Sequence, residues 1–229
     1  MKTLAGMLLA LGIVGAAPPA AAQVPPSPAE AARYTGLHAA AWQGDGPRLL
    51  QLIRAGAPLN ERDGHGRTPL QVATFARQRD AIRLLADAGA DLGALEDDRY
   101  DAVTIAAVAD DEETLRLLLA RGASAKLITS RYDGTALIAA AHLGHDGVVR
   151  QLILAGAPLD HVNNLHWTAL IESIVLGQGG PRHVATLQAL VEAGANTQRA
   201  DRDGRTPLAL ARARGYEPMV LLLSKAGAR

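Results

Sequence analysis

Histidines are the residues of this sequence best suited to metal chemistry. The 229-residue chain has seven, and His142 and His145 lie three positions apart, with His161 and His166 in the finger that follows. His142, His145 and His166 define one functional hypothesis, a metal-dependent hydrolase or an enzyme accessory. Structural zinc, however, needs about four closely spaced ligands and often uses cysteine, which this chain lacks. We therefore expect no metal and no cofactor.

Other chemistry-bearing patterns are weaker still. The acidic clusters at residues 96–98 and 110–113 lack the alternating ligands and bend glycine of a calcium loop, and we expect them to be solvated. No Gly-x-Ser-x-Gly elbow is present. The glycine-rich residues 177–181 lack the Lys-Ser/Thr that follows in a phosphate-binding loop. We predict no catalytic residues and no enzyme activity.

The strongest signal is a repeat rather than a site. The dipeptide Gly-Ala recurs six times, with spacings of 33, 33, 34, 38 and 33 residues. A second column keeps the same period and shares one five-residue insertion. A fixed period in this range indicates stacked supersecondary units. The second column consists of Leu37, Leu70, Thr104, Leu137, Leu170 and Leu208.

The second unit shows what each repeat contains. Thr68 suits a helix N-cap and Pro69 the first helical position. Gly89 is suited to end the second helix, because glycine readily adopts a positive φ. The polar residues 90–100 that follow predict a projecting finger. Each unit is therefore a helix, a turn, a second helix and a finger.

This unit resembles the ankyrin repeat. The matching residues are Thr68-Pro69-Leu70 with Ala73, and again Thr206-Pro207-Leu208 with Ala211. The third repeat departs most, and Asp101 or Thr104 is expected to cap its first helix. The segments at residues 99–107, 161–164 and 179–183 further resemble a group of exported bacterial ankyrin proteins. The resemblance implies an all-α ankyrin-repeat solenoid of about six helix-turn-helix repeats with β-hairpin-like fingers. It also places His38 and His145 where imidazoles hydrogen-bond to turn backbone.

The chain divides into a leader, a short connecting segment and the repeat array. Residues 1–22 have a positive start, an apolar run and small residues at the end, as in a secretory signal peptide. We expect cleavage after Ala22 and a bacterial periplasmic location. Residues 23–34 are predicted to be a Pro-rich linker and N-terminal cap, and residues 35–229 the array. The predicted repeats are about 35–66, 67–100, 101–133, 134–166, 167–204 and 205–229.

Two features of the array lead to structural expectations. The last repeat should be incomplete and act as a cap, with Met219, Val220, Leu222 and Leu223 packed inward. The insertion in the fifth repeat should be a surface loop between its two helices, because loop-length changes cost little when the ends stay close.

The charge balance limits the partners. The chain has 23 basic and 23 acidic residues, so it has no basic field for a phosphate backbone, and nucleic acid is a poor candidate. We expect no membrane insertion after the leader is removed, and a protein that is monomeric on its own. The partner is predicted to be another protein, which the array holds, protects or neutralises.

The resemblance also predicts where that partner binds. In ankyrin-like arrays the fingers and first helices line a concave face, and aromatic and arginine side chains are the usual interface anchors. Trp42 and Phe75 have an alternative role, plugging the groove between repeats. The predicted protein-binding residues are Trp42, Phe75, Arg99, Tyr100, Arg131, Tyr132, His142, Asn164, His166 and Trp167.

Overall fold

The computed structural model describes residues 23–228, so the predicted signal peptide and its cleavage point lie outside the described residues. The described chain forms thirteen helices and no strand. A short helix, α1 (Pro28–Ala31), precedes six helix pairs. The pairs are α2 (Gly36–Gln43) with α3 (Gly46–Arg54), α4 (Pro69–Phe75) with α5 (Arg79–Asp87), α6 (Ala102–Val108) with α7 (Glu112–Ala120), α8 (Ala136–Leu143) with α9 (Asp146–Leu154), α10 (Ala169–Val175) with α11 (Pro181–Glu192), and α12 (Pro207–Ala213) with α13 (Glu217–Lys225).

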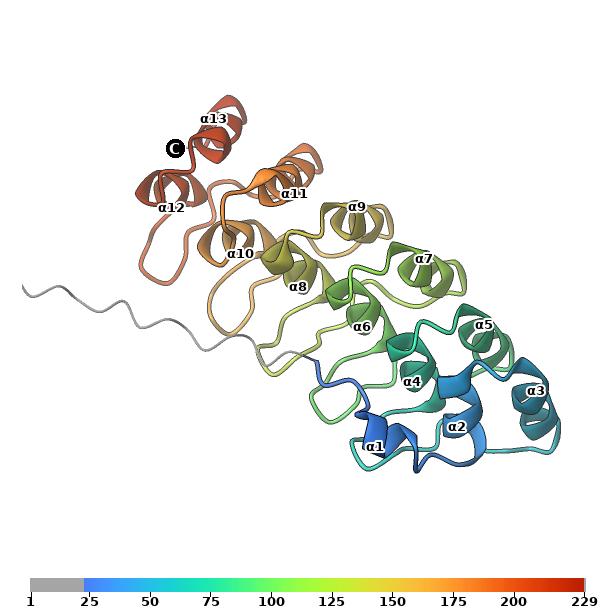
Figure 1. Cartoon of the computed structure of the whole chain (residues 1–229). Helices are drawn as coiled ribbons and strands as arrows, with labels where there is room; N and C mark the ends of the chain where they lie inside the picture. The colour runs from blue at the N-terminus through green and yellow to red at the C-terminus, as the bar shows by residue number, and fades with distance from the viewer. Residues whose placement is uncertain (1–22, 229) are drawn as a thin grey trace, which may run out of the picture.

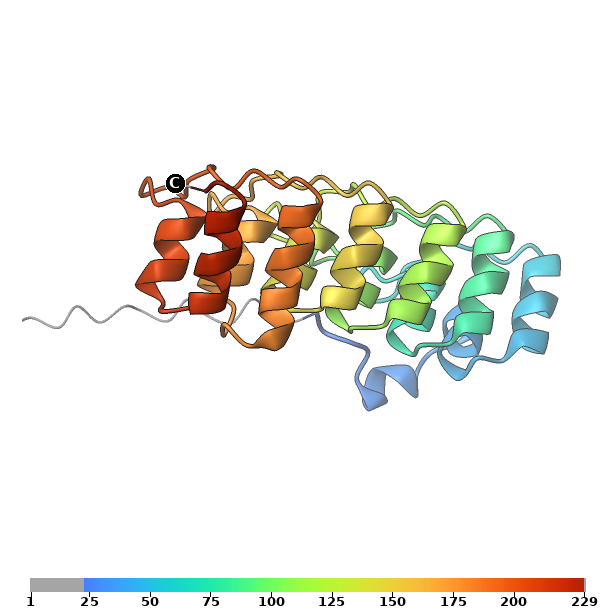
Figure 2. The same cartoon turned by 90° about the horizontal axis from the view of Figure 1, so that it is seen from above.

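The pairs stack along one axis in two rows (Figure 1). The first helices of the pairs, from α2 to α12, form the inner row, and the fingers project on their side. The second helices, from α3 to α13, form the outer row, whose members lie side by side (Figure 2). The predicted all-α solenoid of six helix pairs is confirmed.

A side-chain cap starts every inner helix except α2, whose N-cap residue Thr35 makes no side-chain cap bond. The Thr68 hydroxyl accepts a hydrogen bond from the Gln71 amide, and the Gln71 side chain returns one to the Thr68 amide. This reciprocal arrangement satisfies two amides that the helix leaves unpaired. In the divergent third repeat, Asp101 Oδ1 accepts from the Thr104 amide at 2.8 Å. Of the two predicted caps, Asp101 therefore takes the role.

The core is the layer between the rows. All six residues of the second sequence column, from Leu37 to Leu208, are buried, together with many alanines of the inner helices. In the last pair, Met219 and Leu223 are fully buried, while Val220 and Leu222 are partly buried against the core. The inward packing expected of a capping repeat is confirmed.

The insertion in the fifth repeat differs from the expected surface loop. Its second half lengthens α11, which has 12 residues where the other outer helices have 9. The Tyr216 hydroxyl donates to the Gly177 carbonyl at 3.0 Å, and the His183 ring donates to the His142 carbonyl at 2.9 Å. The insertion is therefore attached to both neighbouring repeats.

The fingers are irregular loops with a common internal clasp. In each, one side chain accepts hydrogen bonds from the amides two and four positions later, through a single oxygen except at Glu96, which uses both carboxylate oxygens. The accepting residues are Asp63, Glu96, Ser130, Asn163 and Asp201. Within residues 23–228 the only β pairing is an isolated bridge between Thr129 and Gly134, so the hairpin-like fingers are closed by turns rather than strands.

Single backbone hydrogen bonds join successive fingers. The Ser130 amide donates to the Arg99 carbonyl at 2.9 Å, and the Asn164 amide donates to the Tyr132 carbonyl at 2.9 Å. These bonds fix the spacing of the side chains that line the inner face.

Candidate protein-binding surface

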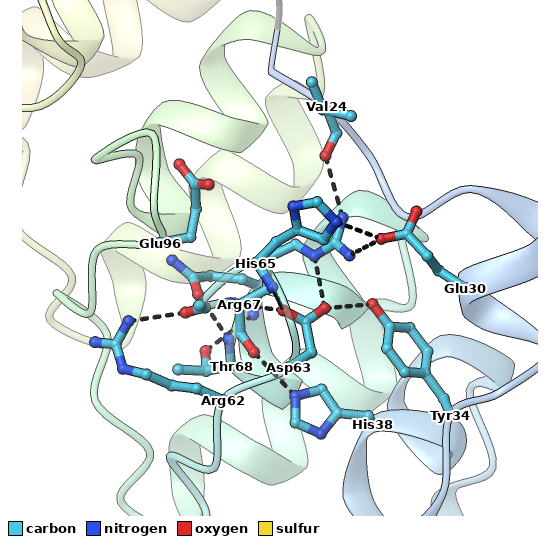
Figure 3. Close-up of polar contacts among 12 residues, drawn as sticks. Val24, Glu30, Tyr34, His38, Arg62, Asp63, His65, Arg67, Thr68 and Glu96 are labelled. Atoms are coloured by element: carbon cyan, nitrogen blue, oxygen red, sulfur yellow. Dashed lines mark hydrogen bonds and ion pairs between the residues drawn. The ribbon is translucent and has the colours of Figure 1, made fainter.

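A buried arginine ties the N-terminal segment to the second repeat (Figure 3). The Arg67 side chain is 2% exposed and donates to Asp63 Oδ2 at 2.7 Å, to Glu30 Oε1 at 2.8 Å and to the Val24 carbonyl at 3.2 Å. The Tyr34 hydroxyl donates to Asp63 Oδ2 at 2.6 Å. The segment predicted to be a Pro-rich linker and N-terminal cap is therefore held against the second repeat by Val24, Glu30 and Tyr34.

The electrostatics of this cluster favour the charged forms. Hydrogen bonding with Ser27, and then with Arg67, lowers the pKa of Glu30 to about 2. Burial acts to raise the pKa of Asp63, but hydrogen bonds from Tyr34, from two backbone amides and from Arg67 outweigh it and lower that pKa. Both carboxylates are thus ionised at neutral pH, so the cluster is an ion-pair network around the buried Arg67, with Glu30 at its partly exposed edge.

The central feature of the inner face is a cavity of about 330 Å³ between the third and fifth repeats. Its aromatic walls come from the fingers, as Tyr100, Tyr132 and Trp167. Its floor is formed by α8 and α10, and the side chain of His142 lines it. Four of the ten predicted binding residues therefore share one cavity.

The predicted residues outside the cavity have other contacts. Arg99 donates to Asp133 Oδ1 at 2.9 Å, and Arg131 is ion-paired with Asp98. These side chains brace neighbouring fingers and remain exposed or half-exposed. Asn164 donates to the Arg131 carbonyl at 3.1 Å, and His166 lies 3.1 Å from an Arg202 nitrogen.

Trp42 and Phe75 are separate from this group. Both are half-buried at the ends of α2 and α4, and neither lines the central cavity. The structure thus gathers the central aromatic residues and not the two near the N-terminal end of the array.

One cavity residue, Glu172, was missed by the sequence reasoning. It lies on α10 with 5% of its surface exposed, and its Oε1 accepts from Asn163 Nδ2 at 2.7 Å. The sequence does contain a signal for it. Glu172 is the fourth residue after the N-cap of its inner helix, and the residue at this position is apolar in every other repeat. The equivalent residues are Ala39, Val72, Ile105, Ala139 and Leu210.

Burial perturbs both ionisable groups on the cavity floor. Desolvation raises the pKa of Glu172 to about 7, although the Asn163 hydrogen bond opposes it. Desolvation, and then the charges of His183 and His145, lower the pKa of His142. At neutral pH His142 is therefore mainly uncharged, and it does not neutralise the carboxylate.

Comparison with known proteins identifies the repeats. A family model for ankyrin repeats, in three copies, matches residues 37–129, 104–180 and 137–229. The ankyrin repeat protein YahD of Escherichia coli K12 is 34% identical over 190 residues, which are 82% of this chain and 94% of that protein. The chain belongs to the ankyrin repeat family.

Solved ankyrin repeat structures have the same fold. An ankyrin repeat domain from Acinetobacter baumannii AYE is 42% identical, with a TM-score of 0.80 over 84% of this chain and 98% of that one. The ankyrin repeat domain of Bcl-3, a member of the IκB protein family, is 29% identical, with a TM-score of 0.76 over 86% of this chain and 88% of that one. Ankyrin repeat domains are generally protein–protein interaction modules and are typically non-catalytic.

The histidines of this ankyrin array have structural contacts. The His38 ring donates to the Arg67 carbonyl and the His145 ring to the Ala107 carbonyl, both at 2.9 Å, which confirms the predicted backbone bonds. His142, His145 and His166 do not converge. Within residues 23–228 no three ligating side chains are grouped to hold a metal, so the hydrolase hypothesis gains no support.

Proposed function

We propose that this protein is a non-catalytic binding module of the bacterial periplasm, which docks another protein on the inner face of its third to fifth repeats. Its first 22 residues serve as a cleaved signal peptide, and the mature protein is a monomer. In the described part of the chain no helix is long and apolar enough to cross a membrane. The module holds, protects or neutralises the partner that it binds.

The observation that carries this proposal is the aromatic-walled cavity at the centre of the inner face. Aromatic side chains in a desolvated pocket are typical interface anchors. Leu165, at the rim, is 37% exposed, and large exposed apolar side chains beside a pocket favour an interaction site. Stacked helices lie about 8–10 Å apart, so three repeats span enough surface for an interface of about 800 Å² per partner.

Binding measurements on matched variants test the docking face. The mature protein is used to capture partners from periplasmic extract, and calorimetry is then done on each purified partner. Tyr132→Ala and Leu165→Ala should each weaken binding by about tenfold or more, as expected for central anchors. Gln188→Ala and Glu192→Ala, on exposed positions of α11, should leave the affinity unchanged. Loss of binding only in the α11 variants would place the partner on the outer face instead.

Trp167 is less suited to this comparison. Its ring lines the cavity but also packs against the hydrophobic core, so truncation should lower the melting temperature as well as the affinity. Tyr132 and Leu165 are not packed against the hydrophobic core, so their variants separate the effect on affinity from the effect on stability.

The export proposal has its own test. Intact mass of the protein recovered from the periplasm should correspond to a chain that begins at Gln23. A membrane-bound species that retains Met1 would contradict the proposal.

A further inference from the structure

The carboxylate of Glu172 lines the central cavity without a full set of partners. Asn163 satisfies Oε1, whereas the nearest ion-pair contact of Oε2 is His142 Nδ1 at 3.7 Å, beyond normal hydrogen-bond length. A buried charge is costly unless it is paired and hydrogen-bonded. The fold does not require this charge, because the other five repeats have an apolar residue at the same position.

No countercharge is supplied by the cavity itself. Its described lining residues include neither lysine nor arginine, and the nearby His142 is mainly neutral. A bound group that brings a positive charge would complete the pairing of Glu172. The charge complementarity of the cavity therefore favours a cation.

The rest of the lining favours a cation carried on an apolar stem. Tyr100, Tyr132 and Trp167 line the walls, and aromatic ring faces attract ammonium and guanidinium groups. Ile138, Leu165 and Leu176 supply apolar contact. The volume of about 330 Å³ is near the lower end of the range of about 300–1,000 Å³ for ligand pockets. Such a cavity suits one long side chain better than a large cofactor.

We propose that this cavity binds the side chain of a lysine or arginine from the partner protein, with its cationic end paired with Glu172 and its stem against the aromatic walls. This inference rests on the proposed function, because the partner brings the side chain. Beyond the proposed docking face, it specifies the chemical group on the partner that the cavity recognises. The array would then select partner segments that present an accessible basic residue.

Small probes test the cavity without the partner. The chain has two tryptophans, Trp167 in the cavity and Trp42 on α2 outside it, so their indole N–H signals give a site reporter and an internal control. We would titrate the ¹⁵N-labelled mature protein with Nα-acetyl-lysine amide and Nα-acetyl-arginine amide. Nα-acetyl-norleucine amide, which has an alkyl chain but no charge, is the matched neutral probe. The titrations are done at about pH 8, where Glu172 is mainly ionised.

At least one cationic probe should shift the Trp167 signal in a saturable way and leave Trp42 unchanged. The norleucine probe should bind at least about tenfold more weakly, and Glu172→Gln should weaken the cation by about tenfold or more, because the paired carboxylate is lost. Glu192→Gln, a surface carboxylate on α11, should have no effect. Circular dichroism melts confirm that each variant is folded.

Three results would overturn the inference. They are equal binding of the neutral and cationic probes, cation binding that is unchanged in folded Glu172→Gln, and no Trp167 shift with either cation. If the cations fail but Tyr132→Ala still weakens partner binding, only this inference is wrong. If a cation binds the cavity but Glu172→Gln leaves partner affinity unchanged, the partner does not place a basic side chain there and this inference is wrong; the docking face is wrong only if Tyr132→Ala and Leu165→Ala also leave partner affinity unchanged.

Discussion

Arg67 and Arg205 form the same finger clasp in two different environments. Each arginine follows an aspartate by four residues and donates from Nε to its Oδ2, at 2.7 Å in the Arg67–Asp63 pair and 2.9 Å in the Arg205–Asp201 pair. The Arg67 side chain is 2% exposed, and it also binds Glu30; the Arg205 side chain is 54% exposed. The pair therefore offers a matched test of what burial does to an ion pair.

Replacing each arginine with alanine should give very different losses of stability. Removing one member of a buried ion pair costs about 3–5 kcal/mol, because the remaining charge is left unpaired. Glu30 keeps its bonds to Ser27 and is partly exposed, so we expect about 3 kcal/mol, near the lower end, for Arg67→Ala. The Arg205 pair is exposed and screened by solvent, so Arg205→Ala should cause a much smaller loss of stability than Arg67→Ala.

Urea denaturation followed by circular dichroism at pH 7 measures both losses. With a slope of about 1–3 kcal/mol per molar urea, Arg67→Ala should lower the midpoint by about 1 M or more. Arg205→Ala should move it by less than half as much. Equal small shifts would refute the reasoning that the buried cluster holds the N-terminal segment, and a changed slope would indicate partial unfolding of the array instead.

Three further predictions concern the rest of the array. Burial raises the pKa of Glu172 to about 7, so its ionisation destabilises the fold as pH rises from about 4.5 to 7. In urea unfolding, the free energy of unfolding of Glu172→Gln relative to that of the wild type should therefore increase by about 2 kcal/mol between pH 5 and pH 8. A difference that does not change with pH would contradict this. Gly177→Ala should lower the free energy of unfolding by about 1–3 kcal/mol in the same assay, because the added Cβ would lie 2.0 Å from the Ser173 carbonyl oxygen. Gly180→Ala is the control, because the space around Gly180 is open, and it should change stability little. Equal losses in the two variants would be inconsistent with this packing. Deleting residues 206–229 should expose the apolar face of the fifth repeat and cause aggregation or a lower melting temperature, and an unchanged thermal melt would count against a capping role.

Periodicity explains why the architecture could be predicted. Each helix pair uses the same few positions for capping and packing, so columns such as Leu70 and Leu137 indicate the fold before any coordinates are considered. The caps at Thr68 and Asp101 are local interactions over three residues, which sequence spacing reports directly. The inward face of the last repeat could be predicted for the same reason.

Contacts between distant parts of the chain could not be predicted in this way. The bond from Arg67 to Glu30 spans 37 residues and depends on the path of the N-terminal segment, which has no repeat counterpart. The attachment of the insertion through Tyr216 is likewise a contact between repeats. A repeat pattern does not predict contacts that occur only once in the chain.

Glu172 shows how a site can be found from departures within the repeats. Aromatic content indicated Tyr132 and Trp167 in the fingers, whereas Glu172 lies on the inner helix α10 and is not aromatic. A charged residue at a position that is apolar in all other repeats marks a place where packing alone does not explain the residue.

Hydrogen–deuterium exchange of the mature protein, alone and bound to a purified partner, tests the docking face most directly. Binding on the inner face predicts slower exchange in residues 129–142 and 163–176, which contain the two central fingers with α8 and α10. Exchange in α9 and α11, on the outer row, should stay the same. Protection confined to α9 and α11, with none in the two fingers, would contradict the proposed binding surface.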